Sequence, residues 1–311
     1  MSRRIILDCD PGHDDALAIL LAHGCPDLEL AAITTVAGNH PLEVTTRNAL
    51  RVCTLAGIAD VPVAAGCGAP LLRELVTAPE IHGEAGLEGH DWDEPAVRPV
   101  ADHAVDVIVD LVMASPGEIT LVPTGPLTNV ALALRRQPRI AERVAGVVLM
   151  GGSYTRGNHT PAAEFNVFVD PEAAAVVFGA GWPVTMVGLD VTHRFLATDE
   201  VLERLAAVGT PAAAAVTGLL GFYRAAHLQA TGRRDAPVHD PCAVACAARP
   251  ELLELRDARV DIELAGRLTA GMTVTDFRPT RERPANAAVA VDVDAPGVWD
   301  LFLDALIRIG R

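Results

Sequence analysis

The stretch that decides the fold runs Ile5-Ile-Leu-Asp-Cys-Asp-Pro-Gly-His-Asp-Asp-Ala16, close to the N-terminus. Its apolar start predicts a buried strand, the Pro-Gly pair a turn, and the paired acids the first turn of a helix, where carboxylates are favoured. In a parallel sheet, ligands bind at the carboxyl ends of the strands. We therefore expect Asp8, Asp10, Asp14 and Asp15 to lie together at that edge.

Outward from this stretch, strand and helix signals alternate along the chain. The predicted strands are residues 4–9, 28–36, 61–64, 119–122, 144–150 and 184–188, and the predicted helices 14–23, 42–55, 102–114, 127–135 and 171–178. The pattern becomes helical from Thr198 through Arg224 and Cys242. Strand-like segments return at 260–263, 272–275 and 288–293, before a last helix at 298–309.

This alternation predicts right-handed βαβ units. We expect one α/β domain over residues 1–311, with a mainly parallel central sheet flanked by helices. Two long loops, 66–99 and 151–166, interrupt the pattern. Loops of that length in a compact domain usually serve function.

The charge balance excludes several kinds of chemistry. The 311 residues include 40 Asp and Glu against 25 Lys and Arg, and all 25 are arginine. Without lysine there is no Schiff-base lysine, no phosphate-binding P-loop lysine and no kinase lysine. The formal net charge of −15 argues against a nucleic-acid partner, because binding to the phosphate backbone depends on clustered cations.

The chain shows no sign of membrane insertion or secretion. Its apolar runs are too short or too interrupted to span a bilayer, and the N-terminus lacks the pattern of a signal peptide. The six cysteines include no Cys-x-x-Cys pair, which is typical of reduced thiols. We expect a cytoplasmic protein with no membrane partner.

The local excess of acid predicts a cation site. Helix capping accounts for one or two aspartates, but four that converge would repel one another unless a cation neutralises them. Carboxylate oxygens without a Cys–His pattern favour Ca²⁺ or Mg²⁺ over zinc. The pair Asp8 and Asp10 is also similar to the Asp-x-Asp motif of haloacid-dehalogenase-like phosphatases. Those enzymes need a lysine, and Gly12 replaces their Thr or Val, which disfavours a phosphatase.

A stronger resemblance covers most of the chain. Residues 8–16 resemble the N-terminal signature of the inosine-uridine-preferring nucleoside hydrolases. Further motifs follow in that family's order: Thr35–Asn39, Ile81–Glu84, Pro123–Asn129, Met150–Ser153, Gly157–Asn158, Ala163–Asn166, Gly188–Val191 and Val238–Asp240. One such motif is a weak signal, but this ordered series is highly specific.

The resemblance implies a nucleoside hydrolase fold with a Rossmann-like core and a ribonucleoside N-ribohydrolase, which releases ribose and the free base. It also implies Ca²⁺ as cofactor, with ribose hydroxyls and a water completing its shell. The implied metal ligands are Asp10, Asp15, Asp240 and the backbone carbonyl of Thr124. By the same resemblance, Asp14 is the general base on that water and Asp8 a supporting acid that orients the other carboxylates.

The resemblance also implies how the substrate is held. The implied ribose-pocket residues are Asn39, Met150, Asn158, Glu164 and Asn166. The resemblance implies that His82 and His239 lie near the base; either is a candidate for the acid that protonates the leaving base, with His239 favoured because it adjoins Asp240. We also expect Phe165, Tyr223 and His227 on the base side, with Gln229 and Arg233 or Arg234 as further candidates for contact with the base. Amides suit hydroxyls that both donate and accept, and histidine exchanges protons near neutral pH.

Taken alone, several of these residues have simpler interpretations. Asn39 follows a glycine and suits a turn. The side chain of Thr124 would cap a helix that begins near residue 127, and Asn166 would merely satisfy nearby backbone groups. The default interpretation of His13, His159, His193 and His227 is structural or surface.

The segment 221–237 bears on base specificity. The opening motif resembles family members that prefer pyrimidine nucleosides, which tend to carry Gln and Tyr in the helix within residues 221–237. This chain has His227 and Thr231 there. We expect uridine and cytidine as substrates, with inosine or broad specificity as the alternative.

Two other classes stay open: a nucleoside-binding protein without catalysis and a phosphoester hydrolase. The family resemblance also implies a homodimer or homotetramer.

Overall fold

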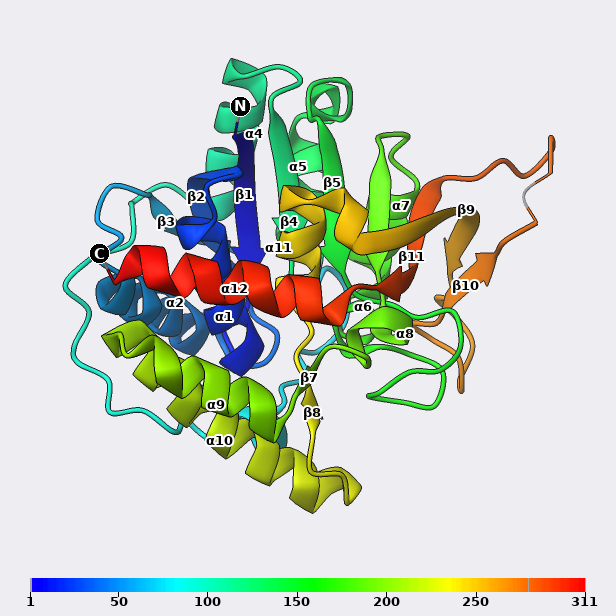
Figure 1. Ribbon diagram of the computed structural model, residues 1–311. Coiled ribbons are helices and arrows are strands. Elements are labelled where there is room, and N and C mark those ends of the chain that lie inside the picture. Colours follow the sequence, from blue (N-terminus) through cyan, green and yellow to red (C-terminus); the bar gives the residue numbers. More distant parts are fainter. Residues whose placement is uncertain (1, 279, 311) are drawn as a thin grey trace.

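The strand β1 (Arg3–Cys9) lies inside a large sheet. The computed structural model describes residues 2–278 and 280–310, and within them nine strands form one sheet in the order β10-β9-β11-β6-β5-β4-β1-β2-β3 (Figure 1). The other strands are β2 (Leu28–Thr35), β3 (Val63–Ala65), β4 (Ile119–Pro123), β5 (Gly146–Met150), β6 (Val184–Val187), β9 (Leu253–Ile262), β10 (Thr273–Asp276) and β11 (Ala287–Val293). β1 pairs in parallel with both β2 and β4, which confirms the predicted parallel core.

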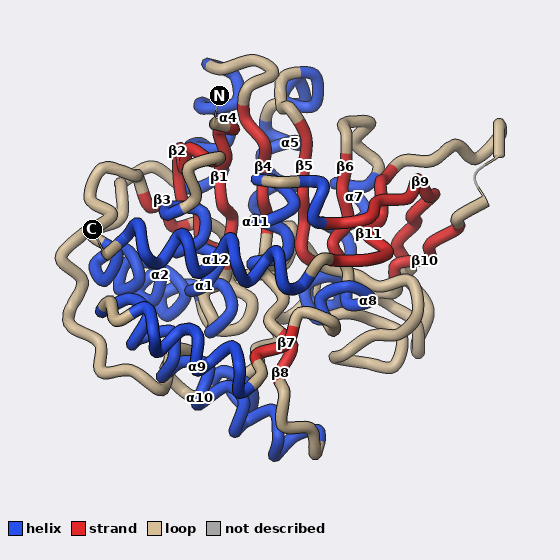
Figure 2. Tube along the Cα trace, viewed as in Figure 1, coloured by secondary structure: helices blue, strands red, loops and turns tan. Residues whose placement is uncertain are grey.

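Apolar side chains on both faces of β1 explain its central place. Ile5, Leu7 and Cys9 join one buried cluster, and Ile6 joins the other, because side chains alternate across a strand. The first cluster includes helices α1 (His13–Gly24), α2 (Leu42–Ala56), α11 (Pro241–Ala248) and α12 (Ala295–Ile309). The second includes α4 (Ala104–Ala114), α5 (Thr128–Arg136) and α7 (Pro171–Phe178). Helices thus cover both faces of the sheet, as predicted (Figure 2).

The antiparallel edge of the sheet was only partly predicted. β9 pairs antiparallel with both β10 and β11, and it begins at Leu253 rather than near residue 260. The first half of β9 was missed because it is rich in charge and largely exposed. An antiparallel strand can leave one face in water, so its sequence need not be apolar.

Short elements lie inside both long loops. The loop predicted over 66–99 contains α3 (Pro79–His82), and the loop predicted over 151–166 ends where α6 (Phe165–Val169) begins. Glu164 caps α6 by accepting from the backbone N–H groups of residues 166 and 167. The predicted helical region contains α9 (Asp199–Val208) and α10 (Pro211–Thr231). The remaining elements are α8 (Leu189–Thr192), β7 (Leu196–Ala197), β8 (Ala236–Pro237) and 3-10 turns at Pro138–Glu142 and Pro250–Leu252.

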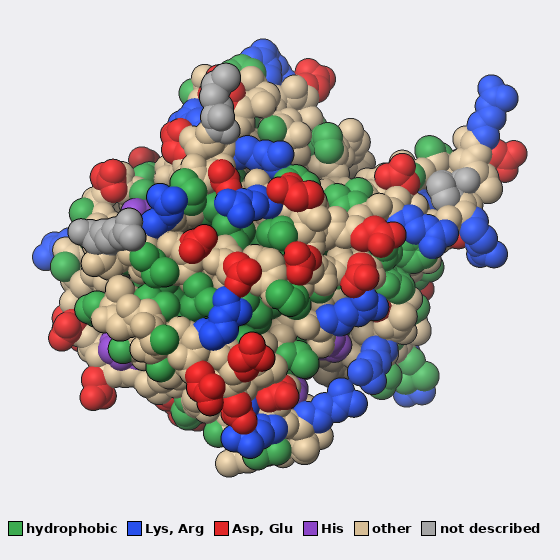
Figure 3. Space-filling view, in the orientation of Figure 1, with side chains coloured by type: hydrophobic (Ala, Val, Ile, Leu, Met, Phe, Trp, Pro, Cys, Tyr) green, Lys and Arg blue, Asp and Glu red, His purple; other side chains and the backbone are tan. Residues whose placement is uncertain are grey.

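The surface carries both signs of charge, with acidic and basic side chains interspersed over the face that α9, α10 and α12 form (Figure 3). All six cysteines lie in the described residues and are free thiols, as expected. In that same part of the chain, no helix is long and apolar enough to cross a membrane.

Candidate active site

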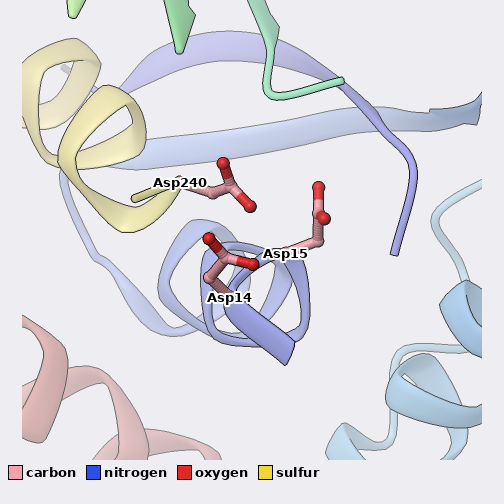
Figure 4. Close-up of side chains that lie close together, drawn as sticks. All are labelled: Asp14, Asp15 and Asp240. Carbon is pink, nitrogen blue, oxygen red and sulfur yellow. The ribbon is translucent and has the colours of Figure 1, made fainter. Parts of the chain in front are cut away.

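Three carboxylates from distant parts of the chain meet at the carboxyl edge of the sheet. Asp14 and Asp15 lie in the first turn of α1, and Asp240 is the residue before α11. Their nearest oxygen atoms all lie within 4.8 Å of one another, and all three side chains are buried (Figure 4). The backbone N–H of His239 donates to Asp14 Oδ2 at 3.3 Å, which ties the two segments together. The structure thus brings together residues that the sequence separates by more than 200 positions.

Asp10 lies next to this cluster and is fully buried. Its Oδ2 accepts from the backbone N–H of Asn39 at 2.6 Å, while its Oδ1 has no hydrogen-bond partner among the described residues. A Cβ at Gly38 would lie 2.1 Å from Oδ2, and one at Gly125 would lie 2.6 Å from Oδ1. Glycine is therefore needed at both positions, because the backbone approaches the carboxylate this closely. Asn39 is more than the turn residue that its neighbours suggested.

Asp15 is held by two donors. Thr124 Oγ1 donates to Oδ1 at 2.8 Å, and the backbone N–H of Gly12 donates to Oδ2 at 3.1 Å. The Gly12 contact caps α1, so helix capping is a correct but incomplete account of this aspartate. The suggestion that Thr124 caps the following helix is wrong, because its hydroxyl donates to Asp15 and α5 has no side-chain cap.

Asp8 lies beneath the cluster. Its Oδ1 accepts from Thr34 Oγ1 at 2.6 Å and from Asn129 Nδ2 at 2.8 Å, while Oδ2 has no partner in the described part of the chain. Burial raises the pKa of Asp8 to about 6, although both hydrogen bonds act to lower it. Asp8 therefore links β1 to β2 and α5 and does not reach the cluster of Asp14, Asp15 and Asp240.

The electrostatics of the cluster favour a cation. Burial, and then repulsion by Asp14, raises the pKa of Asp15 to about 7. Burial also raises the pKa values of Asp10 and Asp240 well above the usual range, and neighbouring carboxylates add to both shifts. Each shift shows that negative charge here is costly without compensation. The donors are all oxygen atoms, and one is an unpartnered buried oxygen of Asp10, so these residues fit a hard divalent cation.

A pocket of about 950 Å³ opens above the cluster. Every site residue predicted from the sequence lines it, except Asp8, Asp10 and Asp15, which lie underneath. Residues of α3, α6 and α10 line the pocket, together with Asp14 of α1 and Asp240 at the start of α11. Its size is in the range of small-molecule sites, and a nucleoside fits it.

One wall of the pocket is a network around Glu164 and Asn166. Glu164 accepts from the backbone N–H groups of Gly152 and Asn166, both at 2.9 Å. Asn166 Nδ2 donates to the carbonyls of Thr124 at 2.7 Å and Met150 at 3.2 Å. Asn166 therefore does satisfy backbone groups, as its simpler interpretation held. Those groups include the Thr124 carbonyl, which keeps a second lone pair for another partner.

The opposite wall is a stack of rings. His82, from α3, and Tyr223, from α10, have ring centroids 5.8 Å apart. His13 lies behind them at 5.5 Å from His82 and 5.6 Å from Tyr223, and it is fully buried. His13 is thus structural, as expected. His227 follows Tyr223 by one helical turn and also lines the pocket.

Near the mouth, the structure adds residues that the sequence did not single out. Arg156, His159 and His193 line the pocket; His159 is exposed, in keeping with its default interpretation as a surface residue, and His193 is half-buried. His193 has its ring centroid 5.7 Å from that of His239, whose Nδ1 lies 2.8 Å from the hydroxyl of Thr192. The only available signal was position: residues 156 and 159 fall in a long loop, and residue 193 follows the end of β6.

Solved structures share this architecture. A purine-preferring ribonucleoside hydrolase from Gardnerella vaginalis aligns with a TM-score of 0.93 at 33% identity, covering 99% of both chains. The plant nucleoside hydrolase PpNRh1 aligns with a TM-score of 0.92, also at 33% identity, covering 100% of this chain and 99% of that one. The fold is therefore that of nucleoside hydrolases.

Sequence comparison agrees. An inosine-uridine preferring nucleoside hydrolase from Crithidia fasciculata is 52% identical, and one from Leishmania major is 53% identical; each alignment covers 100% of this chain and 99% of the relative. The pyrimidine-specific ribonucleoside hydrolase RihA from Photobacterium profundum is 47% identical over 98% of this chain and 99% of the relative. The family described as inosine-uridine preferring nucleoside hydrolase matches residues 5–300. The chain belongs to this family of enzymes, which hydrolyse the N-glycosidic bond of ribonucleosides.

Proposed function

We propose that this enzyme is a Ca²⁺-dependent hydrolase that prefers pyrimidine ribonucleosides, uridine first. The observation that carries the proposal is the buried group of carboxylates beneath a pocket of nucleoside size. We also propose a homodimer or homotetramer. Inosine is the second candidate substrate, because relatives that are more than 50% identical over the whole chain are named for both inosine and uridine.

Asp10, Asp15, Asp240 and the carbonyl of Thr124 would hold the ion. Three of these groups are carboxylates whose negative charge burial makes costly, which supports a resident cation. A bound Ca²⁺ supplies a hard Lewis acid that orients ribose and water oxygens and makes a water proton easier to remove. Calcium suits this set better than zinc because every donor is oxygen.

Asp14 has the position of a general base. It is the carboxylate of α1 that lines the pocket, and the N–H of His239 fixes one of its oxygens. Asp14 accepts a proton from water as the water oxygen attacks C1′ of the ribose. The C1′–N bond breaks, its electron pair stays on the base nitrogen, and His239 supplies a proton to the base. Burial lowers the pKa of His239, so its protonated form gives up the proton readily.

The two walls have different proposed partners. Asn39, Asn158, Glu164 and Asn166, with Met150, face the ribose, because amides and a carboxylate match its hydroxyls. We propose that the side chains facing the base are His82, Phe165, Tyr223 and His227. Uridine appears in the name of one group of relatives, and pyrimidine specificity appears in that of the other, which supports uridine as the first substrate.

A kinetic panel tests the function. We expect kcat/KM to be highest for uridine, followed by cytidine, then inosine, with adenosine and guanosine lowest, measured as release of reducing sugar. Inosine in first place would replace the pyrimidine preference with the alternative. Sugar release that never exceeds one per chain with any of the five would contradict catalysis.

Removal of calcium is expected to make stability depend on pH. The pKa values of Asp8 and Asp15 are raised to about 6 and about 7, so the folded metal-free protein binds more protons than the unfolded chain. Its stability therefore falls as pH rises through these values. With a chelator, Tm should drop from pH 5 to pH 8, and added Ca²⁺ should raise Tm more at pH 8 than at pH 5. An equal increase at both pH values would contradict a carboxylate site.

Substitution at Asp14 and Asp10 separates chemistry from metal binding. Asp14→Asn should still bind Ca²⁺, measured by calorimetry, while kcat falls about 10²- to 10⁴-fold because the general base is lost. Asp10→Ala should lose both Ca²⁺ affinity and activity. Full turnover of Asp10→Ala in the presence of a chelator would refute the metal assignment.

The role of His239 is tested by the leaving group. In His239→Ala, cleavage of uridine should fall by about 10²-fold or more, because the base then leaves without a proton. Cleavage of 4-nitrophenyl riboside should fall much less, since nitrophenolate is stable as an anion. Equal losses with both substrates would count against His239 as the acid.

A further inference from the structure

The pocket is polarised, with carboxylates at its floor and cations at its mouth. Arg156 comes from the segment between β5 and α6, and Arg233 from the segment between α10 and β8; both line the pocket and are exposed. Over residues 2–278 and 280–310, no ion pair includes the guanidinium of Arg156 or Arg233. Two separate segments thus bring uncompensated positive charge to one opening.

Two neighbouring arginines differ from Arg156 and Arg233, because carboxylates of the protein pair with them. Arg234 also lines the pocket, but its guanidinium lies 3.2 Å from a carboxylate oxygen of Asp199. Arg224 pairs with Asp199 at 2.9 Å and with Asp235 at 3.0 Å. Their charges are largely compensated within the protein, so Arg156 and Arg233 remain available to a ligand.

The charges of Arg156 and Arg233 both act on the ring of His193. Its ring lies beside that of His239, and it lines the same pocket. Burial, and then the positive charges of His239, Arg156, His227 and Arg233, lowers the pKa of His193 to about 4. All four therefore lie close enough to act on one ring at the outer end of the pocket.

The carboxylates of the pocket do not cancel this field. Asp14 and Asp240 are buried at the floor, and Glu164 is buried in the wall, where it accepts from backbone N–H groups. Asp235 is paired with Arg224. Glu80, on α3, also lines the pocket and is exposed, but the charges with the largest effects on the ring of His193 are those of His239, Arg156, His227 and Arg233. Around His193, positive charge therefore outweighs negative charge.

We propose that the outer end of this pocket is an anion subsite, and that the substrates of the enzyme include ribonucleosides whose base carries a negatively charged group. The inference rests on the proposed function, which places ribose at the acidic floor and the base towards the mouth. The chemistry agrees with it. When the C1′–N bond breaks, its electron pair goes to the base, so a positive field there favours departure of the base as well as binding of an anionic one.

A matched pair of substrates tests the subsite. 5-Carboxyuridine and 5-carbamoyluridine have nearly the same shape, but only the first is anionic. The carbamoyl group withdraws electrons more strongly, so leaving-group chemistry alone favours the neutral compound. We expect kcat/KM to favour the carboxylate roughly five- to tenfold at low ionic strength, and the ratio to shrink in salt, because these cations are exposed.

Substitution of single arginines tests which side chains form the anion subsite. In Arg156→Gln and in Arg233→Gln, the ratio of carboxylate to carbamoyl substrate should fall towards one. Arg234→Gln is the matched control, since it removes the same charge from the same loop but from an arginine that Asp199 already neutralises. Its ratio should stay near that of the unchanged enzyme. A fall in the control equal to that in the other two variants would overturn the proposal.

Uridine and uridine 5′-monophosphate complete the experiment. If uridine is cleaved and 5-carboxyuridine has no advantage over its neutral partner, the anion subsite is refuted while the proposed function stands. An arginine-dependent preference for the 5′-monophosphate, without one for 5-carboxyuridine, also overturns the assignment to the base. If neither uridine nor any charged analogue is cleaved, the proposed function itself has failed.

Discussion

The structure depends on the repulsion among buried carboxylates at the end of β1. Asp10, Asp14, Asp15 and Asp240 lie together away from water, where like charges are most costly. The fold offsets this cost by local means. The first turn of α1 adds positive dipole to two of the acids, and donors from Asn39, Thr124 and Gly12 reach the oxygens. These contacts reduce the repulsion but leave an oxygen of Asp10 unpartnered within the described residues.

That constraint shapes the backbone around the cluster. The loops after β2 and β4 approach Asp10 so closely that a side chain at Gly38 or Gly125 would collide with its oxygens. Asp8, one layer below, ties β1 to β2 and α5 through Thr34 and Asn129. The strand ends are thereby fixed relative to one another, and the pocket above them has a rigid acidic floor.

Much of this was predictable from sequence because the information is local. Alternation of apolar strands and amphipathic helices predicted the parallel core, and the position of the aspartates after the first strand predicted that Asp10, Asp14 and Asp15 lie at one edge. Asp240 was assigned to that edge only by the family resemblance, and Asp8, expected there too, does not reach the cluster. The first half of β9 was missed because a strand of an antiparallel pair can carry charge on a face exposed to water, and this half is largely exposed. Arg156, His159 and His193 were not identified from the sequence for a different reason. Their place at the pocket depends on how loops and α8 fold back, which no periodicity in the chain records.

The absence of lysine bears on both ends of the pocket. A cation at the mouth must stay charged beside partly buried histidines, and guanidinium does so at every accessible pH. An ammonium group in such surroundings would shift its pKa with each change in burial or in neighbouring charge. The charge of arginine is therefore independent of pH, whereas burial, and then neighbouring positive charge, lowers the pKa values of His193, His227 and His239. In this proposal the arginines supply the positive field and His239 supplies the proton. A negatively charged base can therefore bind beside His239 without changing the charge of the arginines that attract it.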